Sequence, residues 1–181
     1  MGIAANQARL MTLTARQNDL EYKAQQISAI KMRLSQTSST LASNYADALN
    51  NYSKLNAAQQ MQEKYAAKAD DDGNVTDTVF FTVNADGTFA ISSNGGVGAS
   101  GLFNAVAAAI GGANISTTAN GYLTYQQGIY TSETEQLSAQ EKVYDMELTQ
   151  VNTEHDAIKT EYDAIKSLVG DNVEKSFNVF G

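Results

Sequence analysis

Between Ile3 and Asp72 the chain contains neither glycine nor proline, and an apolar residue recurs at every seventh position. Such a heptad repeat gives a helix an apolar stripe that packs against a partner helix. The whole chain lacks proline, which suits uninterrupted helices because proline breaks helix interiors. We therefore predict a long coiled-coil helix over residues 1–69. Its seam comprises Leu13, Leu20, Ile27, Leu34, Leu41, Ala48 and Leu55.

The companion position of this seam is mixed. It is apolar or aromatic at its ends and polar or small in its middle, and it reads Leu10, Gln17, Ala24, Lys31, Ser38, Tyr45 and Tyr52. Polar residues at seam positions set the register of a coiled coil or allow the helix to bind several neighbouring helices. We expect Tyr45 and Tyr52, as surplus aromatic residues, to contact neighbouring copies of the chain.

A second heptad pattern occupies residues 129–181 and predicts a C-terminal long helix. We expect Gly170 to loosen or end it and Asp171 to help cap a short final helix. That helix would carry Phe177 and Phe180 on one face, as further candidates for contact between subunits. The predicted seam comprises Leu137, Tyr144, Leu148, Val151, His155, Ile158, Tyr162, Ile165 and Val169.

The composition changes in residues 70–128, which we predict to form a small inserted α+β lobe. The run Val79–Val83, a turn ending at Gly87 and the run Thr88–Ser92 predict a β-hairpin. The segment Asp70–Asn74 is expected to end the first helix, since carboxylates oppose the dipole at a helix C-terminus.

Three further elements are expected in the lobe. Gly95–Gly101 reads as a flexible loop, and the apolar run Leu102–Ile110 as a short buried helix. Tyr122–Tyr125 reads as a third strand. The predicted fold class is therefore mainly α, with a long antiparallel coiled-coil hairpin of the N- and C-terminal helices and the lobe inserted between them.

The two predicted helices carry opposite net charges. Residues 1–68 carry eight Lys or Arg against four acidic residues, whereas residues 129–181 carry four Lys against eleven acidic residues. We expect the opposite charges to favour pairing of the two helices with each other. The basic residues are not clustered as phosphate binding requires, so we expect no nucleic-acid partner.

No residue set predicts catalysis, a cofactor or a metal. The aspartates after Asp70 lack the closing glutamate of a calcium loop, and Gly95–Gly101 lacks the lysine of a phosphate loop. His155, the only histidine, is interpreted as a polar register residue, with pH sensing as the alternative. A catalytic triad would need His155 to leave the seam, so we expect no enzyme.

The first ten residues lack the basic and apolar segments of a cleaved signal, and no apolar run reaches the length of a membrane span. We expect a protein without a membrane span that stays inside the cell or leaves it without a cleaved leader.

Two terminal helices around a lobe rich in Gly, Ser, Thr and Asn, without cysteine or proline, resemble flagellin-like axial proteins and type III-secreted filament subunits. The resemblance is architectural and covers the whole chain, and Met32–Ser35 (Met-Arg-Leu-Ser) is similar to the flagellin N-terminal region. The ending Glu174–Gly181 departs from the flagellin C-terminus, so a true flagellin is not expected.

The resemblance implies a self-assembling subunit of an extracellular bacterial filament or appendage, with the terminal helices in the core and the lobe exposed. Its partners would be copies of itself and an export chaperone. The alternative is an intracellular, cytoplasmic coiled-coil adaptor or chaperone-like binding module.

Overall fold

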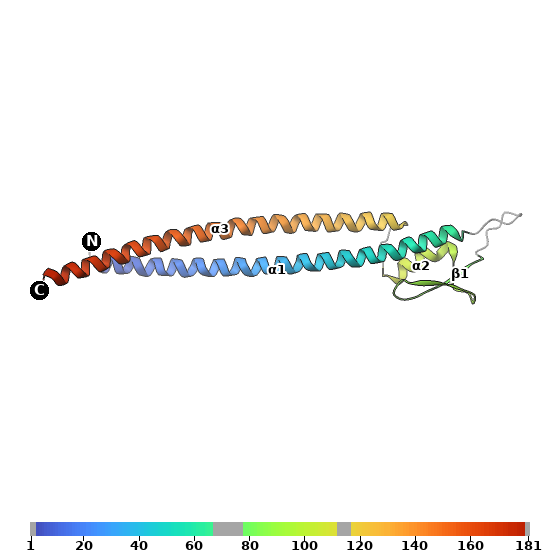
Figure 1. The fold of residues 1–181 in the computed structure, drawn as a ribbon, viewed down its shortest axis with the longest axis horizontal. Coiled ribbons are helices and arrows are strands. Elements are labelled where there is room, and N and C mark those ends of the chain that lie inside the picture. Colours follow the sequence, from blue (N-terminus) through green and yellow to red (C-terminus); the bar gives the residue numbers. More distant parts are fainter. Residues whose placement is uncertain (1–2, 67–77, 112–116, 180–181) are drawn as a thin grey trace. The chain divides into compact units, whose positions relative to one another are not determined.

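The computed structural model describes residues 3–66, 78–111 and 117–179, and these are mainly helical (Figure 1). The chain divides into two compact units, which are described separately. The first comprises Met1–Ser38 and Gln136–Gly181, and the second comprises Ser39–Glu135. The elements in chain order are α1 (Ile3–Lys64), β1 (Phe80–Val83), β2 (Phe89–Ser92), β3 (Val97–Gly98), the 3-10 helix η1 (Ala99–Gly101), α2 (Leu102–Ala109) and α3 (Ala119–Val179).

In the first unit, the long N- and C-terminal helices pack together. Leu13 and Leu20 of α1 form a buried cluster with Ile158 and Ile165 of α3. Full burial of each such side chain stabilises the folded state by about 1.5–3 kcal/mol. These four residues belong to the two heptad patterns of the sequence. The half-buried residues beside the cluster are Leu10, Val151, Tyr162 and Val169.

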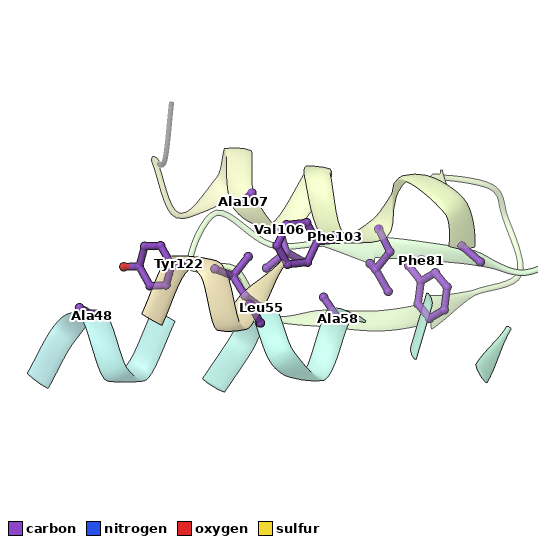
Figure 2. Close-up of a cluster of buried hydrophobic side chains, with 11 residues drawn as sticks. Ala48, Leu55, Ala58, Phe81, Phe103, Val106, Ala107 and Tyr122 are labelled. Carbon is purple, nitrogen blue, oxygen red and sulfur yellow. The ribbon is translucent and has the colours of Figure 1, made fainter. Parts of the chain in front are cut away.

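In the second unit, α1, α2, β1 and the start of α3 surround one apolar core (Figure 2). Leu55, Phe81, Leu102 and Val106 are its largest fully buried side chains. Leu55 comes from the heptad stripe of α1, so here the stripe packs on the lobe. The buried members of this core are Ala48, Leu55, Ala58, Phe81, Ala99, Leu102, Phe103, Val106, Ala107, Ala119 and Tyr122.

Two glutamines of α1 bind backbone groups around this core. The Oε1 atom of Gln59 accepts a hydrogen bond from the Ala119 amide at 3.0 Å. Gln62 accepts one from the Phe103 amide at 3.4 Å and donates one to the Ser100 carbonyl at 3.1 Å. Because the first amides of a helix have no partner within it, these glutamines satisfy the starts of α2 and α3.

The predicted β-hairpin is confirmed. Strands β1 and β2 pair antiparallel with Phe81 opposite Ile91, and the sheet has the order β2-β1-β3. The third strand, however, is Val97–Gly98, which lies within the segment we predicted to be a flexible loop. A β-carbon on Gly96 would lie 2.4 Å from the carbonyl oxygen of Phe81. The glycines therefore let this segment approach β1 closely enough to pair.

The predicted strand Tyr122–Tyr125 is wrong, because these residues lie in the first turns of α3. The hydroxyl oxygen of Thr118 accepts a hydrogen bond from the Gly121 amide at 3.1 Å, which is the bond of a helix N-cap. Ala119 and Tyr122, one helical turn apart, are both buried in the core of the second unit. Capping and helical spacing outweigh the β propensity of the tyrosines.

The predicted helix end at Gly170 is also wrong, and with it the short capped helix after Asp171, because α3 continues to Val179. A glycine inside a helix costs only about 1 kcal/mol relative to alanine. Packing of Ile165 and Val169 in the first unit offsets that cost. The backbone of Phe177 lies in α3, whereas its side chain, Phe180 and the segment Asp70–Asn74 lie outside the described residues.

Candidate assembly interface

The predicted seam residues all lie on buried or half-buried faces. In the first unit the buried seam residues are Leu13, Leu20, Ile27, Leu34, Ile158 and Ile165. The half-buried ones are Leu137, Tyr144, Leu148, Val151, His155, Tyr162 and Val169. Leu41, Ala48 and Leu55 are buried in the second unit. The first unit thus brings the two predicted seams together over Leu13–Leu20 and Ile158–Ile165.

Tyr45 and Tyr52, predicted to contact other subunits, make contacts inside the second unit. The ring of Tyr45 stacks on that of Tyr130 with centroids 4.4 Å apart and planes at 19°. The hydroxyl of Tyr52 donates to the Oδ1 atom of Asn120 at 3.2 Å. Both tyrosines are half-buried, so their contacts within the chain take up much of their surface.

Two ion pairs link the helices of the first unit. The guanidinium of Arg9 donates two hydrogen bonds to the Oε1 atom of Glu161, one of them from Nε at 2.9 Å. The ammonium of Lys31 lies 2.5 Å from the Oδ1 atom of Asp145. Each pair joins a basic residue of α1 to an acidic residue of α3, as the charge separation in the sequence predicts.

His155 lies at the seam with two carboxylates near its ring. Its Nε2 atom is 3.5 Å from the Oε1 atom of Glu21, and its Nδ1 atom is 3.7 Å from the Oδ1 atom of Asp156. The imidazole is 29% exposed. A polar ring in this position, between two helices, fits the role of a register residue.

Charged residues also repeat every seven positions beside the seam. Arg9, Arg16 and Lys23 do so on α1, and Glu147, Glu154 and Glu161 do so on α3. Only one contact among these six, Arg9 with Glu161, is an ion pair. The other four side chains are exposed and unpaired by ionic contacts within the described residues.

Three of these four side chains, Lys23, Glu147 and Glu154, line a groove of about 360 Å³ between α1 and α3 of the first unit, whereas Arg16 does not line it. Its apolar lining comes from Leu20, Ile27, Ile30, Tyr144 and Val151, and its polar lining from Lys23, Gln26, Glu147, Gln150 and Glu154. An apolar floor between charged rims suits a helix surface with an apolar side chain at its centre. Sequence reasoning missed this groove, because it depends on how the two helices are spaced.

Sequence reasoning also missed the apolar side chains outside the seam. Met11 is 72% exposed, Tyr22 62%, Met32 71% and Met146 64%. Met11 and Met32 are three heptads apart, so they lie on the same side of a coiled-coil helix. Searching the heptads for large apolar residues outside the seam positions would have found them.

Other kinds of site are not seen in the described parts of the chain. No three His, Asp or Glu side chains among residues 3–66, 78–111 and 117–179 gather as metal ligands would. None of the helices in these ranges combines the length and apolarity that crossing a membrane requires.

Comparisons with models of known protein families, with curated proteins and with solved structures give no match to this chain.

Proposed function

We propose that this chain is a structural, self-assembling subunit of an extracellular bacterial filament or surface appendage, similar to flagellin-like axial proteins, and not an enzyme. In this proposal α1 and α3 form an antiparallel coiled-coil hairpin whose outer faces contact further copies. The lobe of the second unit is exposed on the assembly.

The order of the ionic contacts supports the antiparallel arrangement. Along α1, Arg9 comes before Glu21 and Lys31. Their partners on α3 follow the reverse order, from Glu161 through His155 to Asp145. Helices that run in opposite directions pair residues in this way.

The observation that carries self-assembly is the exposure of large apolar side chains on the first unit. The seam between α1 and α3 already buries the heptad residues. Met11, Tyr22, Met32 and Met146 lie outside this buried cluster and remain more than 60% exposed. Covering exposed apolar side chains with a further surface removes them from water and so lowers the free energy of the system. A second copy of the chain is the partner we propose.

Measurement of assembly against concentration tests this function. Light scattering and negative-stain microscopy of the full chain are expected to show polymers that grow with protein concentration. A variant with Met11→Gln, Met32→Gln and Met146→Gln should assemble less, because it removes the exposed apolar surface. A control with Gln7→Ala, Gln25→Ala and Gln140→Ala changes exposed positions on the same helices and should assemble normally. A single small oligomer at every concentration would contradict the proposal.

A second candidate is an intracellular, cytoplasmic adaptor or chaperone-like binding module. The groove of about 360 Å³ favours it, because an apolar floor between charged rims can receive a helix of a different protein. This candidate predicts a closed oligomer of fixed size, which sedimentation velocity would show as one boundary independent of concentration.

A further inference from the structure

We infer that the groove of the first unit receives Met32 and Arg33 of a second copy of this chain. The inference rests on the proposed function and names the contact that would join one copy to the next. It follows from three properties of the first unit: the chemistry of the groove, the charges on its rim that form no ion pair within the described residues, and an exposed segment of α1 that complements both.

The groove has an apolar floor and an acidic rim. Leu20, Ile27 and Val151 contribute to the floor. Glu147 and Glu154 line the groove from α3 and Lys23 lines it from α1, so two carboxylates face one ammonium. No ion pair within the described residues uses either glutamate, although Gln150 donates a hydrogen bond to Glu154 at 3.2 Å. The groove therefore suits an apolar side chain with a cation beside it.

Met32 and Arg33 provide this combination on α1. Met32 is 71% exposed, and its flexible thioether side chain adapts to irregular apolar surfaces. Arg33 follows it directly, is exposed, and forms no ion pair among the described residues. Its guanidinium presents several donors that a carboxylate accepts.

The other exposed apolar residues of α1 fit less well. Met11 is as exposed as Met32, but nearby Arg9 is already paired with Glu161. Tyr22 lies between Glu21 and Lys23, and Lys23 lines the groove itself. The exposed apolar residues of α3 also fit less well. Residues 136–179 of this helix carry nine acidic residues against four lysines. The acidic rim of the groove therefore repels this segment.

The proposed contact is heterologous, because one copy contributes Met32 and Arg33 while the other contributes the groove. After each addition the growing assembly then keeps a free groove at one end and a free Met32 at the other. Contacts of this kind build rings when the rotation closes and open filaments when it does not. The inference thus gives the proposed self-assembly a direction.

Charge exchange tests the contact. Arg33→Glu alone, and Glu147→Lys with Glu154→Lys, should each weaken self-association by about tenfold or more, because attraction becomes repulsion. A chain that carries all three changes should recover self-association, since the contact is restored with its signs exchanged. Arg16→Glu, also on the exposed surface of α1, serves as the matched control and should change association less than threefold. Circular dichroism of each variant checks that the helices remain folded.

Cysteine cross-linking provides a second measurement, because the natural chain has no cysteine. One chain would carry Met32→Cys and a differently tagged chain Gln150→Cys. Mild oxidation of the mixture should join the two chains. Met11→Cys, which is equally exposed, should not cross-link to the Gln150→Cys chain.

The outcomes separate this inference from the proposed function. If the natural chain forms no polymers, the proposed function fails. If it polymerises while the charge variants assemble normally and Met32→Cys forms no cross-link, only the assignment of the groove is overturned. Loss of assembly in the single variants without recovery in the combined variant would also overturn the pairing of Arg33 with the two glutamates.

Discussion

Arg9 of α1 and Glu161 of α3 form an ion pair that joins the two helices of the first unit. The same two helices bury the cluster of Leu13, Leu20, Ile158 and Ile165. The side chains of Arg9 and Glu161 are 57% and 39% exposed, so water and salt screen their attraction. Apolar burial at the seam is therefore the larger contribution to stability, and the charges mainly select which helix faces which.

Arg9→Glu should lower the free energy of unfolding by about 0.5–1 kcal/mol, because it places two carboxylates together. Arg9→Glu combined with Glu161→Arg should recover most of this loss. Urea unfolding of both variants and of the natural chain, at low and high salt, measures the coupling. An effect that does not shrink at high salt would contradict an exposed pair.

Leu55→Ala should destabilise the second unit by about 2–5 kcal/mol, because a fully buried leucine leaves a cavity in a core that collapses only partly. Leu55 has no exposed surface, whereas Leu49 on the same helix is 41% exposed. Leu49→Ala is thus the matched control and should cost far less. Chemical unfolding and hydrogen exchange of α2 amides would show the difference, and equal effects of the two substitutions would refute the described core.

Gly170→Ala should stabilise the protein by about 0.5–1 kcal/mol, because alanine loses less backbone entropy in a helix interior. A β-carbon at Gly170 meets no atom within 4 Å, and the same holds for Gly128. Thermal unfolding should show a higher midpoint for either substitution. A lower midpoint for Gly170→Ala would mean that α3 does not run through this position.

Gly87→Ala, in contrast, should destabilise the protein. Gly87 has φ of 80°, and a β-carbon there would lie 2.4 Å from the Cγ2 atom of Ile110. Both the left-handed backbone and the close approach to Ile110, directly after α2, disfavour alanine. Hydrogen exchange of the hairpin amides should quicken in this variant, and unchanged exchange would speak against the described turn.

The turn of the hairpin should weaken in acid. The side-chain hydroxyl and then the amide of Thr88 donate to the Asp86 carboxylate, which lowers the pKa of Asp86 below its usual value. A pKa lowered by folding contributes stability above the unfolded value, about 3.9, that is lost as the pH falls through the folded value. The protection factors of the β1 and β2 amides, which are their exchange rates corrected for the intrinsic rate at each pH, should therefore fall between pH 5 and pH 2. In Asp86→Asn this acid-dependent part should disappear, and its persistence would assign it to another group.

Local signals in the sequence were sufficient for the long helices, the hairpin and the helix at Leu102–Ala109. Two helices can share a seam when each has an apolar residue at every seventh position, as Leu13 and Leu20 do on α1 and Ile158 and Ile165 do on α3. The sequence pattern therefore indicates the packing directly. They were not sufficient at Tyr122–Tyr125, where aromatic residues indicate a strand but a Thr118 cap and a buried helical face decide otherwise. At Gly170 the local helix-ending signal was outweighed by apolar contacts on either side.

The sequence by itself determined that two long helices form, which faces they bury and which helix carries which charge, because each depends on spacing along one chain. Only the tertiary structure decided what Leu55 packs against, where Tyr45 and Tyr52 lie, and that a groove opens between Lys23 and Glu147. Those features depend on distances between segments far apart in the sequence, and such distances are set by side-chain packing across elements. The proposed contact of Met32 and Arg33 with that groove combines a residue pattern with a cavity that only folding creates.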